Sequence, residues 1–338
     1  MRRLGIAALF VIFWGCGHRV KEPIVKLPPS DIREPDRSLY EQAIKDLRKS
    51  RFNVARLTLQ TLINTYPDSE FLPEAKYALA ESFYREGTTS NLNQAESEFK
   101  DFITFFPTSD RADDAQMMIA MTHIRQLEKP DRDVTQAHLA ETELKRMIES
   151  YPDSPLLDEA KEKLRAVQEM LADGVYKIAN QYYVRHSYRA AISRYHEVLD
   201  KYPDYSRTPD VLFNIAESLR ETDSPESATY YAKLVSDHPR SYRVTMAKNH
   251  LAEMKQPIPE VNPAALAQSE NGKNAEDDEH KGLLQKVFAG LLYRSPVSTD
   301  TNASAVKGSV LDRQDSKDTD TEAGGSLTIE NKPAKRPK

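Results

Sequence analysis

The chain has 338 residues, of which 29% are charged, and its formal net charge at pH 7 is −5. Charges of both signs are interspersed, which argues against the basic surface that binds nucleic acid. The composition changes after residue 256, where Pro, Ser, Asn, Asp and Lys replace helix formers and apolar residues. Such a segment cannot bury enough surface to offset its chain entropy, so we expect residues 257–338 to form a mostly disordered tail.

The N-terminus has the composition of an export signal. Met1-Arg2-Arg3 carries positive charge, and the apolar run that follows, residues 4–14, is too short to span a bilayer. The run ends at Gly15-Cys16-Gly17, which contains the single cysteine of the chain. This arrangement resembles a bacterial lipobox and implies a signal peptide over residues 1–15 with lipidation of Cys16. A free cysteine in an ordinary signal peptide is the alternative.

The lipobox resemblance also implies a location. Gly17 stands where an aspartate would resemble an inner-membrane retention signal, so we expect the periplasmic face of the outer membrane. Acyl chains contribute about 0.8 kcal/mol per buried methylene, so the lipid alone can anchor the protein. Residues 16–35 contain four prolines and should form an extended, disordered tether. We expect membrane contact through this lipid anchor only.

Five prolines mark an internal repeat. They are Pro67, Pro107, Pro152, Pro203 and Pro239, separated by 40, 45, 51 and 36 residues. Twelve positions before each proline stands a small residue: Ala55, Ala95, Ala140, Ala191 and Ser227. Eight positions before each stands a large one: Leu59, Phe99, Leu144, Tyr195 and Tyr231. This spacing predicts one stripe of an amphipathic helix, which the proline then ends.

A second helix is expected after each proline. Four prolines are followed two residues later by a serine that we interpret as an N-cap: Ser69, Ser109, Ser154 and Ser241. Small residues let the helix axes approach closely, so the hairpins should stack as a solenoid. The pattern resembles the tetratricopeptide (TPR) repeat and predicts an all-α, TPR-type helical-hairpin solenoid of about five repeats. An unrelated helical bundle is the alternative.

The gap between Pro152 and Pro203 is the longest. It predicts a helix over residues 156–183, interrupted only near Asp173-Gly174, that acts as a stiff spacer. We therefore expect an N-terminal module over residues 36–155 and a C-terminal module over 156–256, with limited relative motion. Within the tail, residues 281–293 have the pattern of a short amphipathic helix, which touches a membrane, folds on a partner or has no role.

The sequence offers no catalytic constellation. The 11 glycines form no phosphate-binding loop, and the eight histidines lack zinc-ligand spacing. Asp131-Arg132-Asp133 lacks the glycine and glutamate of a calcium loop, and Asp133 should instead cap a helix over residues 135–150. No serine lies in a nucleophile elbow. We therefore expect no enzyme, no metal and no cofactor.

Four segments together resemble the BamD family, lipoproteins of the outer-membrane β-barrel assembly machinery. They are FNVARLTLQTLINTYPDS (residues 52–69), PDRD (130–133), LKRMIESYPDS (144–154) and YRAAISRYHEVLDKYPD (188–204). The resemblance covers about residues 16–254. Gly174, where the family tends to have a larger residue, and the tail after residue 256 depart from the family pattern.

The BamD resemblance implies a non-catalytic scaffold. Its N-terminal repeats would receive unfolded outer-membrane proteins, and its C-terminal repeats would dock on the periplasmic repeat domains of the barrel subunit, beside other assembly lipoproteins. By the same match, Arg194 corresponds to the arginine of the docking helix. Asp131, Arg132 and Asp133 match a loop beside the binding pocket.

Aromatic residues supply candidates for a peptide groove independently of the family. Tyr40, Tyr77, Phe83 and Tyr84 lie on the first helices of the repeats and are of types enriched at binding hot spots, although they can equally belong to the core. Two other functions stay open. One is a TPR envelope protein that coordinates the Tol-Pal or cell-wall machinery, and the other is an envelope enzyme with accessory repeats.

Overall fold

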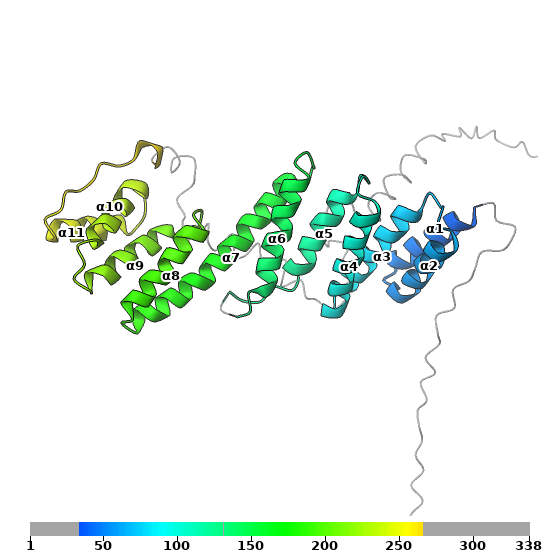
Figure 1. The fold of residues 1–338 in the computed structure, drawn as a ribbon, viewed down its shortest axis with the longest axis horizontal. Coiled ribbons are helices and arrows are strands. Elements are labelled where there is room, and N and C mark those ends of the chain that lie inside the picture. Colours follow the sequence, from blue (N-terminus) through cyan, green and yellow to red (C-terminus); the bar gives the residue numbers. More distant parts are fainter. Residues whose placement is uncertain (1–33, 131, 266–338) are drawn as a thin grey trace, which may run out of the picture.

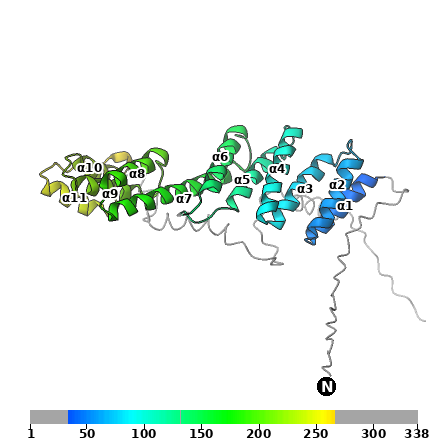
Figure 2. The same ribbon diagram turned by 60° about the horizontal axis from the view of Figure 1, so that its bottom comes forward.

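The computed structural model describes residues 34–130 and 132–265. Within these residues the regular elements are α-helices: α1 (Pro35–Arg48), α2 (Phe52–Thr65), α3 (Leu72–Glu86), α4 (Thr89–Phe105), α5 (Ala112–Ile124), α6 (Thr135–Ser150), α7 (Leu157–Val184), α8 (Tyr188–Lys201), α9 (Thr208–Arg220), α10 (Ser227–Asp237) and α11 (Val244–Glu253). Consecutive helices pack as hairpins, and the hairpins stack in one row (Figure 1). A second view shows the same elongated stack (Figure 2). The predicted TPR-type solenoid is confirmed.

The second helix of every hairpin ends in the same conformation. The C-cap residues of α2, α4, α6, α8 and α10 all have φ between −127° and −132° and ψ between 58° and 65°. Each of them directly precedes a repeat proline, whose ring pushes the preceding residue out of the α region. The prediction that the prolines end these helices in register is confirmed.

The serines after the prolines do not occupy N-caps, so that prediction is wrong by two residues. The hydroxyl of Ser69 accepts from the amide of Phe71 at 3.1 Å, and the Leu72 amide bonds to the Ser69 carbonyl. The same side-chain bond recurs at Ser109, Ser154 and Ser241. Each serine therefore closes a separate turn that leads into the helix. The Ser69 hydroxyl also donates to Asp36 of α1 at 2.7 Å, which lowers the pKa of Asp36.

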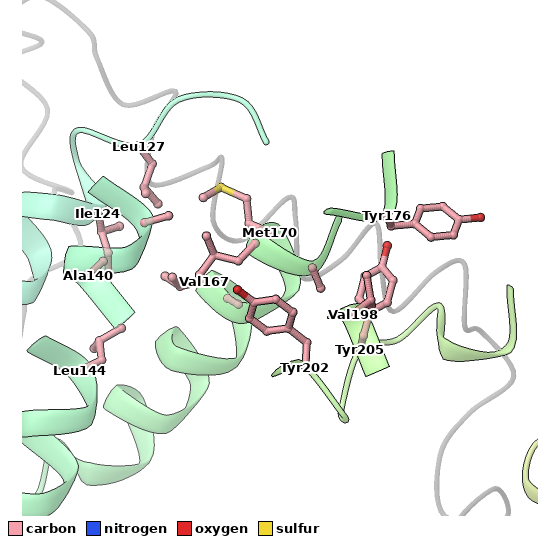
Figure 3. Packing of buried hydrophobic residues seen from close by; sticks show 14 of the residues in the cluster. Ile124, Leu127, Ala140, Leu144, Val167, Met170, Tyr176, Val198, Tyr202 and Tyr205 are labelled. Atoms are coloured by element: carbon pink, nitrogen blue, oxygen red, sulfur yellow. The ribbon is translucent and has the colours of Figure 1, made fainter. Parts of the chain in front are cut away.

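The small and large repeat positions form the core, as predicted. All five small residues and all five large ones are 0% exposed. Buried apolar residues fall into three clusters, spanning α1 to α5, α5 to α9, and α9 to α11. Figure 3 shows the middle cluster, where Leu144 of α6, Val167 of α7 and Tyr202 after α8 converge. The core is therefore continuous through the shared helices α5 and α9.

Helix α7 corrects the predicted interruption near Asp173-Gly174, because it runs unbroken from Leu157 to Val184. A Cβ at position 174 would lie 2.7 Å from the carbonyl oxygen of Pro130, in the loop before α6. Gly174 thus lets that loop lie directly on the backbone of α7. Glycine costs a helix about 1 kcal/mol relative to alanine, and this close packing offsets the cost.

The buried clusters do not divide the chain where the two predicted modules meet. Helix α7 lies inside the middle cluster, and the clusters change at α5 and α9 rather than at residue 155. Two modules with limited relative motion stay a prediction. The predicted signal peptide, most of the predicted tether, and residues 266–338 with the predicted amphipathic segment 281–293 lie outside the described residues.

The described chain ends on the C-terminal hairpin. After α11 it turns back, and the amide of Asn262 donates to the carbonyl of Ser236 near the end of α10 at 3.1 Å. In Figure 1 this segment runs from α11 back above α10. In the part of the chain that the structure describes, none of the helices combines the length and apolar character needed to cross a membrane.

A tryptophan at position 95 tests the hairpin register. Ala95 is 0% exposed, so Ala95→Trp must overpack the second hairpin and lower the free energy of unfolding by about 3 kcal/mol. Ser97→Trp places the same ring on the exposed side of α4 and should leave the thermal midpoint near that of the wild type. Equal midpoints for Ala95→Trp and wild type in a circular-dichroism melt would contradict the register.

Gly174→Ala tests the contact between α7 and the loop before α6. Helix propensity alone would stabilise the protein by about 1 kcal/mol, whereas a clash with the Pro130 carbonyl should destabilise it by about 1–3 kcal/mol. We expect destabilisation in denaturant unfolding, together with faster hydrogen exchange in residues 128–134. A gain in stability would show that the loop does not lie on the helix.

Candidate functional site

The loop between α5 and α6 carries part of the predicted partner-binding set. Asp131 lies outside the described residues. Arg132 is exposed and lies 3.7 Å from Glu128, an ion pair too exposed to hold its guanidinium firmly. Asp133 accepts from the amide of Thr135 at 2.8 Å. Arg132 is therefore presented to solvent, whereas Asp133 is engaged in the turn that starts α6.

Helix α6 begins at Thr135 and ends at Ser150, as predicted. The N-cap position is Val134, so Asp133 stabilises the helix start from one residue earlier than a cap. Hydrogen bonds from the Thr135 side chain and amide lower the pKa of Asp133, which keeps it charged beside the positive end of the helix. Asp133 and the contact of Pro130 with Gly174 thus fix the two sides of this loop that the structure describes.

Arg194 lies on the outer face of α8. The inner face of this helix buries Ala191, Tyr195 and Val198, so Arg194 points away from the core with a side chain that is 49% exposed. Its guanidinium donates to Glu197 at 2.7 Å. Hydrogen bonds from Lys201 and Arg194 lower the pKa of Glu197, which therefore stays charged. The result is an ordered arginine that a partner can reach.

Two of the four candidate groove aromatics are buried. Tyr40 is 7% exposed and stacks on Phe71 with ring centroids 5.3 Å apart. Tyr77 is 2% exposed and meets the edges of Phe99 and Phe102 at 5.3 and 5.5 Å. Burial raises the pKa of Tyr40. Tyr40 therefore packs the first hairpin against the start of the second, and Tyr77 packs within the second hairpin.

Phe83 and Tyr84 lie nearer the surface at the end of α3, and each has an arginine over its ring. Arg56 lies 4.5 Å from the Phe83 centroid, and Arg125 lies 4.7 Å from that of Tyr84. Arg125 also donates to the Tyr84 carbonyl, one of the unpaired carbonyls at the helix end. Of the four aromatics, these two are therefore the better placed to meet a ligand.

A row of arginines was missed by the sequence reasoning. Arg111, Arg207 and Arg243 each stand four residues after a repeat proline, and each guanidinium lies over an aromatic ring of the preceding first helix. The rings are those of Tyr77, Tyr176 and Phe213, at 3.8, 4.5 and 4.7 Å. Spacing from the proline was the available signal, but it does not show which ring each arginine meets.

Asp210 joins the arginines of the last two repeats. It lies 3.1 Å from Arg207 and 2.9 Å from Arg243, and it accepts from the hydroxyl of Tyr242 at 2.5 Å. Desolvation raises the pKa of Tyr242 to about 12, and its bond to Asp210 adds to the shift. Because Asp210 is 3% exposed, these contacts satisfy a carboxylate that would otherwise be costly to bury.

The predicted site residues do not converge on one site. The aromatics lie on α1 and α3, the residues 132–133 loop lies in the middle of the stack, and Arg194 lies on α8 (Figure 1). In residues 34–130 and 132–265, histidine and carboxylate side chains form no group of three that could hold a metal ion. The geometry is that of separate surfaces along the stack.

Comparisons with known proteins identify relatives over most of this stack. The family model YfiO, described as an outer membrane lipoprotein, matches residues 33–234. Outer membrane protein assembly factor BamD of Vibrio cholerae is 25% identical over 210 residues, which are 59% of this chain and 82% of that protein. BamD of Xylella fastidiosa strain Temecula1 is 22% identical, covering 72% and 81%. BamD of Rickettsia prowazekii is also 22% identical, covering 67% and 90%.

Solved structures with similar helical repeats include two TPR proteins. The TPR2AB domain of yeast Sti1 in its complex with pHSP90 has a TM-score of 0.34 and 14% identity, covering 76% of this chain and 98% of that chain. The TPR domain of P58(IPK) has a TM-score of 0.34 and 16% identity, covering 78% and 67%. The family model, by contrast, matches well over half of the chain. The chain belongs to the YfiO/BamD family of outer membrane lipoproteins, which are non-enzymatic assembly factors.

Proposed function

We propose that this family member is a scaffold of the β-barrel assembly machinery that holds an unfolded outer-membrane protein at its N-terminal repeats and the barrel subunit at its C-terminal repeats. Membership in the family carries the general role in assembly. The observation that carries the docking half is Arg194, an exposed and ordered arginine on the outer face of α8. Its position matches the docking arginine implied by the family resemblance.

The docking surface would consist of Arg194, Glu197 and Lys201. The three side chains form a chain of ion pairs along one face of α8, with both pairs at 2.7 Å. Such a surface of both charges favours orientation and association rate more than raw affinity. The partner would be a folded periplasmic domain of the barrel subunit that presents complementary charges, with other assembly lipoproteins beside it.

The N-terminal repeats would receive the unfolded substrate. Phe83 and Tyr84 offer aromatic surface at the end of α3, next to the guanidinium groups of Arg56 and Arg125. Aromatic and arginine side chains are enriched at binding hot spots. Arg56 is already paired with Glu86 at 2.6 Å, so Arg125 would be the arginine that pairs with a terminal carboxylate. Tyr40 and Tyr77 would support this surface from the core. Arg132 and its neighbours Asp131 and Asp133 would contact the partner from the middle of the stack.

The lipid anchor is the third part of the proposal. Cys16, which lies outside the described residues, would be acylated and hold the stack at the periplasmic face of the outer membrane. Membership in a family of outer membrane lipoproteins supports this role. The same family match and the BamD relatives favour barrel assembly over coordination of the Tol-Pal or cell-wall machinery.

Arg194→Glu tests the docking surface. Charge reversal should lower the affinity for the barrel subunit at least about tenfold, because it places two acidic groups where one ion pair stood. Arg146→Glu is a matched control: Arg146 is 50% exposed and pairs with Glu143 three residues before it, as Arg194, 49% exposed, pairs with Glu197 three residues after it. Co-purification from detergent-solubilised host membranes gives the measurement.

Recovery of the barrel subunit should fall with Arg194→Glu and persist with Arg146→Glu, while both variants keep the helical circular-dichroism signal. Equal recovery with both variants would remove Arg194 from the docking surface. Recovery of Tol-Pal or peptidoglycan proteins in place of the barrel subunit would overturn the assembly proposal itself.

Cys16→Ser tests the anchor. Without the thiol no acyl chain can be attached, so the variant should leave the outer-membrane fraction and appear with the soluble envelope proteins. Mass spectrometry of the mature N-terminal peptide from the wild type should show the added acyl mass on Cys16. An unmodified Cys16 in a membrane-bound wild type would contradict lipidation at this residue.

A further inference from the structure

The C-terminal half of α7 exposes an apolar stripe. Leu171, Val175, Ile178 and Tyr182 follow one another at spacings of four, three and four residues, which places them on one side of the helix. Leu171 is buried, whereas Ile178 and Tyr182 are 46% and 36% exposed. No described segment covers this end of the stripe. An apolar side that emerges from the core in this way is suited to bind another segment.

Positive charge adjoins the exposed end of the stripe. Arg185 lies three residues after Tyr182 on the same side of the helix, and Arg189 is the second residue of α8, which follows after a three-residue turn. Both side chains are exposed, and neither forms an ion pair with another described residue. The carboxylate of nearby Glu221 forms an ion pair with the guanidinium of Arg220 instead, at 3.8 Å. We call Ile178, Tyr182, Arg185 and Arg189 the α7 patch.

We propose that residues 276–294 of the same chain dock on the α7 patch. This segment lies outside the described residues, and its sequence matches the patch in two respects. Glu276-Asp277-Asp278-Glu279 supplies four carboxylates for the two arginines. The residues that follow place six apolar side chains at helical spacing: Leu283, Leu284, Val287, Phe288, Leu291 and Leu292. An amphipathic helix laid on an apolar stripe is a recurring mode of recognition.

Only ten residues separate the end of the described chain from the docking segment. The bond from Asn262 to Ser236 turns the polypeptide back over α10, toward the rest of the stack (Figure 1). Residues 266–275, which link the described chain to the docking segment, span up to about 35 Å if extended. A tether of this length gives the segment a high effective concentration at the patch, which an untethered partner lacks.

Hydrogen exchange on the full mature chain tests the docking. Deletion of residues 276–294 should raise the exchange rate of amides in residues 178–187 by about tenfold, because the covering segment is gone. A synthetic peptide of residues 274–294, added to the deletion variant, should restore the slow exchange. Residues 52–65 of α2 serve as an internal reference that neither change should affect.

Two surface variants locate the contact. Ile178→Glu, and separately the pair Arg185→Glu with Arg189→Glu, should weaken peptide binding to the deletion variant at least about tenfold. Leu57→Glu is the matched control, since Leu57 is 39% exposed on α2 and should leave binding unchanged. Fluorescence anisotropy of the labelled peptide gives the affinities, and circular dichroism confirms that each variant is folded.

Three outcomes would overturn the proposal. One is equal exchange of residues 178–187 with and without residues 276–294. Another is peptide binding that Ile178→Glu leaves unchanged, which would place the contact elsewhere. The third is a peptide that binds vesicles of outer-membrane phospholipid but not the deletion variant, which would assign the segment to the membrane surface. Each is independent of docking at Arg194, so this proposal and the proposed function can fail separately.

Discussion

The stack depends on one constraint, which is that every second helix ends at the same point before a proline. The five C-cap residues share nearly one conformation, so each chain segment leaves its helix in the same direction. After four of the five prolines a serine then closes a turn that leads into the next helix. With fully buried small residues at constant spacing, adjacent hairpins can approach closely, and the solenoid follows from repetition of this unit.

The arginines that follow the prolines join one repeat to the next. Each stacks on a ring of the preceding first helix, a contact worth about 0.5–2 kcal/mol depending on its desolvation. Asp210 links two of them, so the last repeats share a buried charge network rather than apolar contacts alone. Removal of one member would leave the others buried without compensation, which ties the order of α9 to that of α11.

Much of the fold could be predicted because its signals are local. Helix α6 has the predicted bounds, and the repeat positions are buried as expected. The predictions failed where a contact between residues far apart in the sequence determines the local structure. In the sequence Gly174 resembles a helix break, whereas in the structure it makes room for the Pro130 carbonyl against α7. Tyr77 and Tyr84 are alike in sequence, yet one fills the core and the other lies at a helix end beside Arg125. Arg194 and the loop residues 131–133 became candidates only through the family resemblance, because the exposure and the partners of a side chain depend on packing.

The α7–α8 hairpin carries both of the proposed binding surfaces. Arg194 lies on the outer face of α8, and the α7 patch lies on the other helix of the same hairpin, with Arg189 at the start of α8. If residues 276–294 bind the patch, they would stabilise the hairpin that presents Arg194, and by reciprocity a partner bound at Arg194 would stabilise the hairpin that binds the segment. Coupling arises only if each ligand prefers one arrangement of that hairpin. Partner and tail would then promote or oppose each other's binding through a single structural unit.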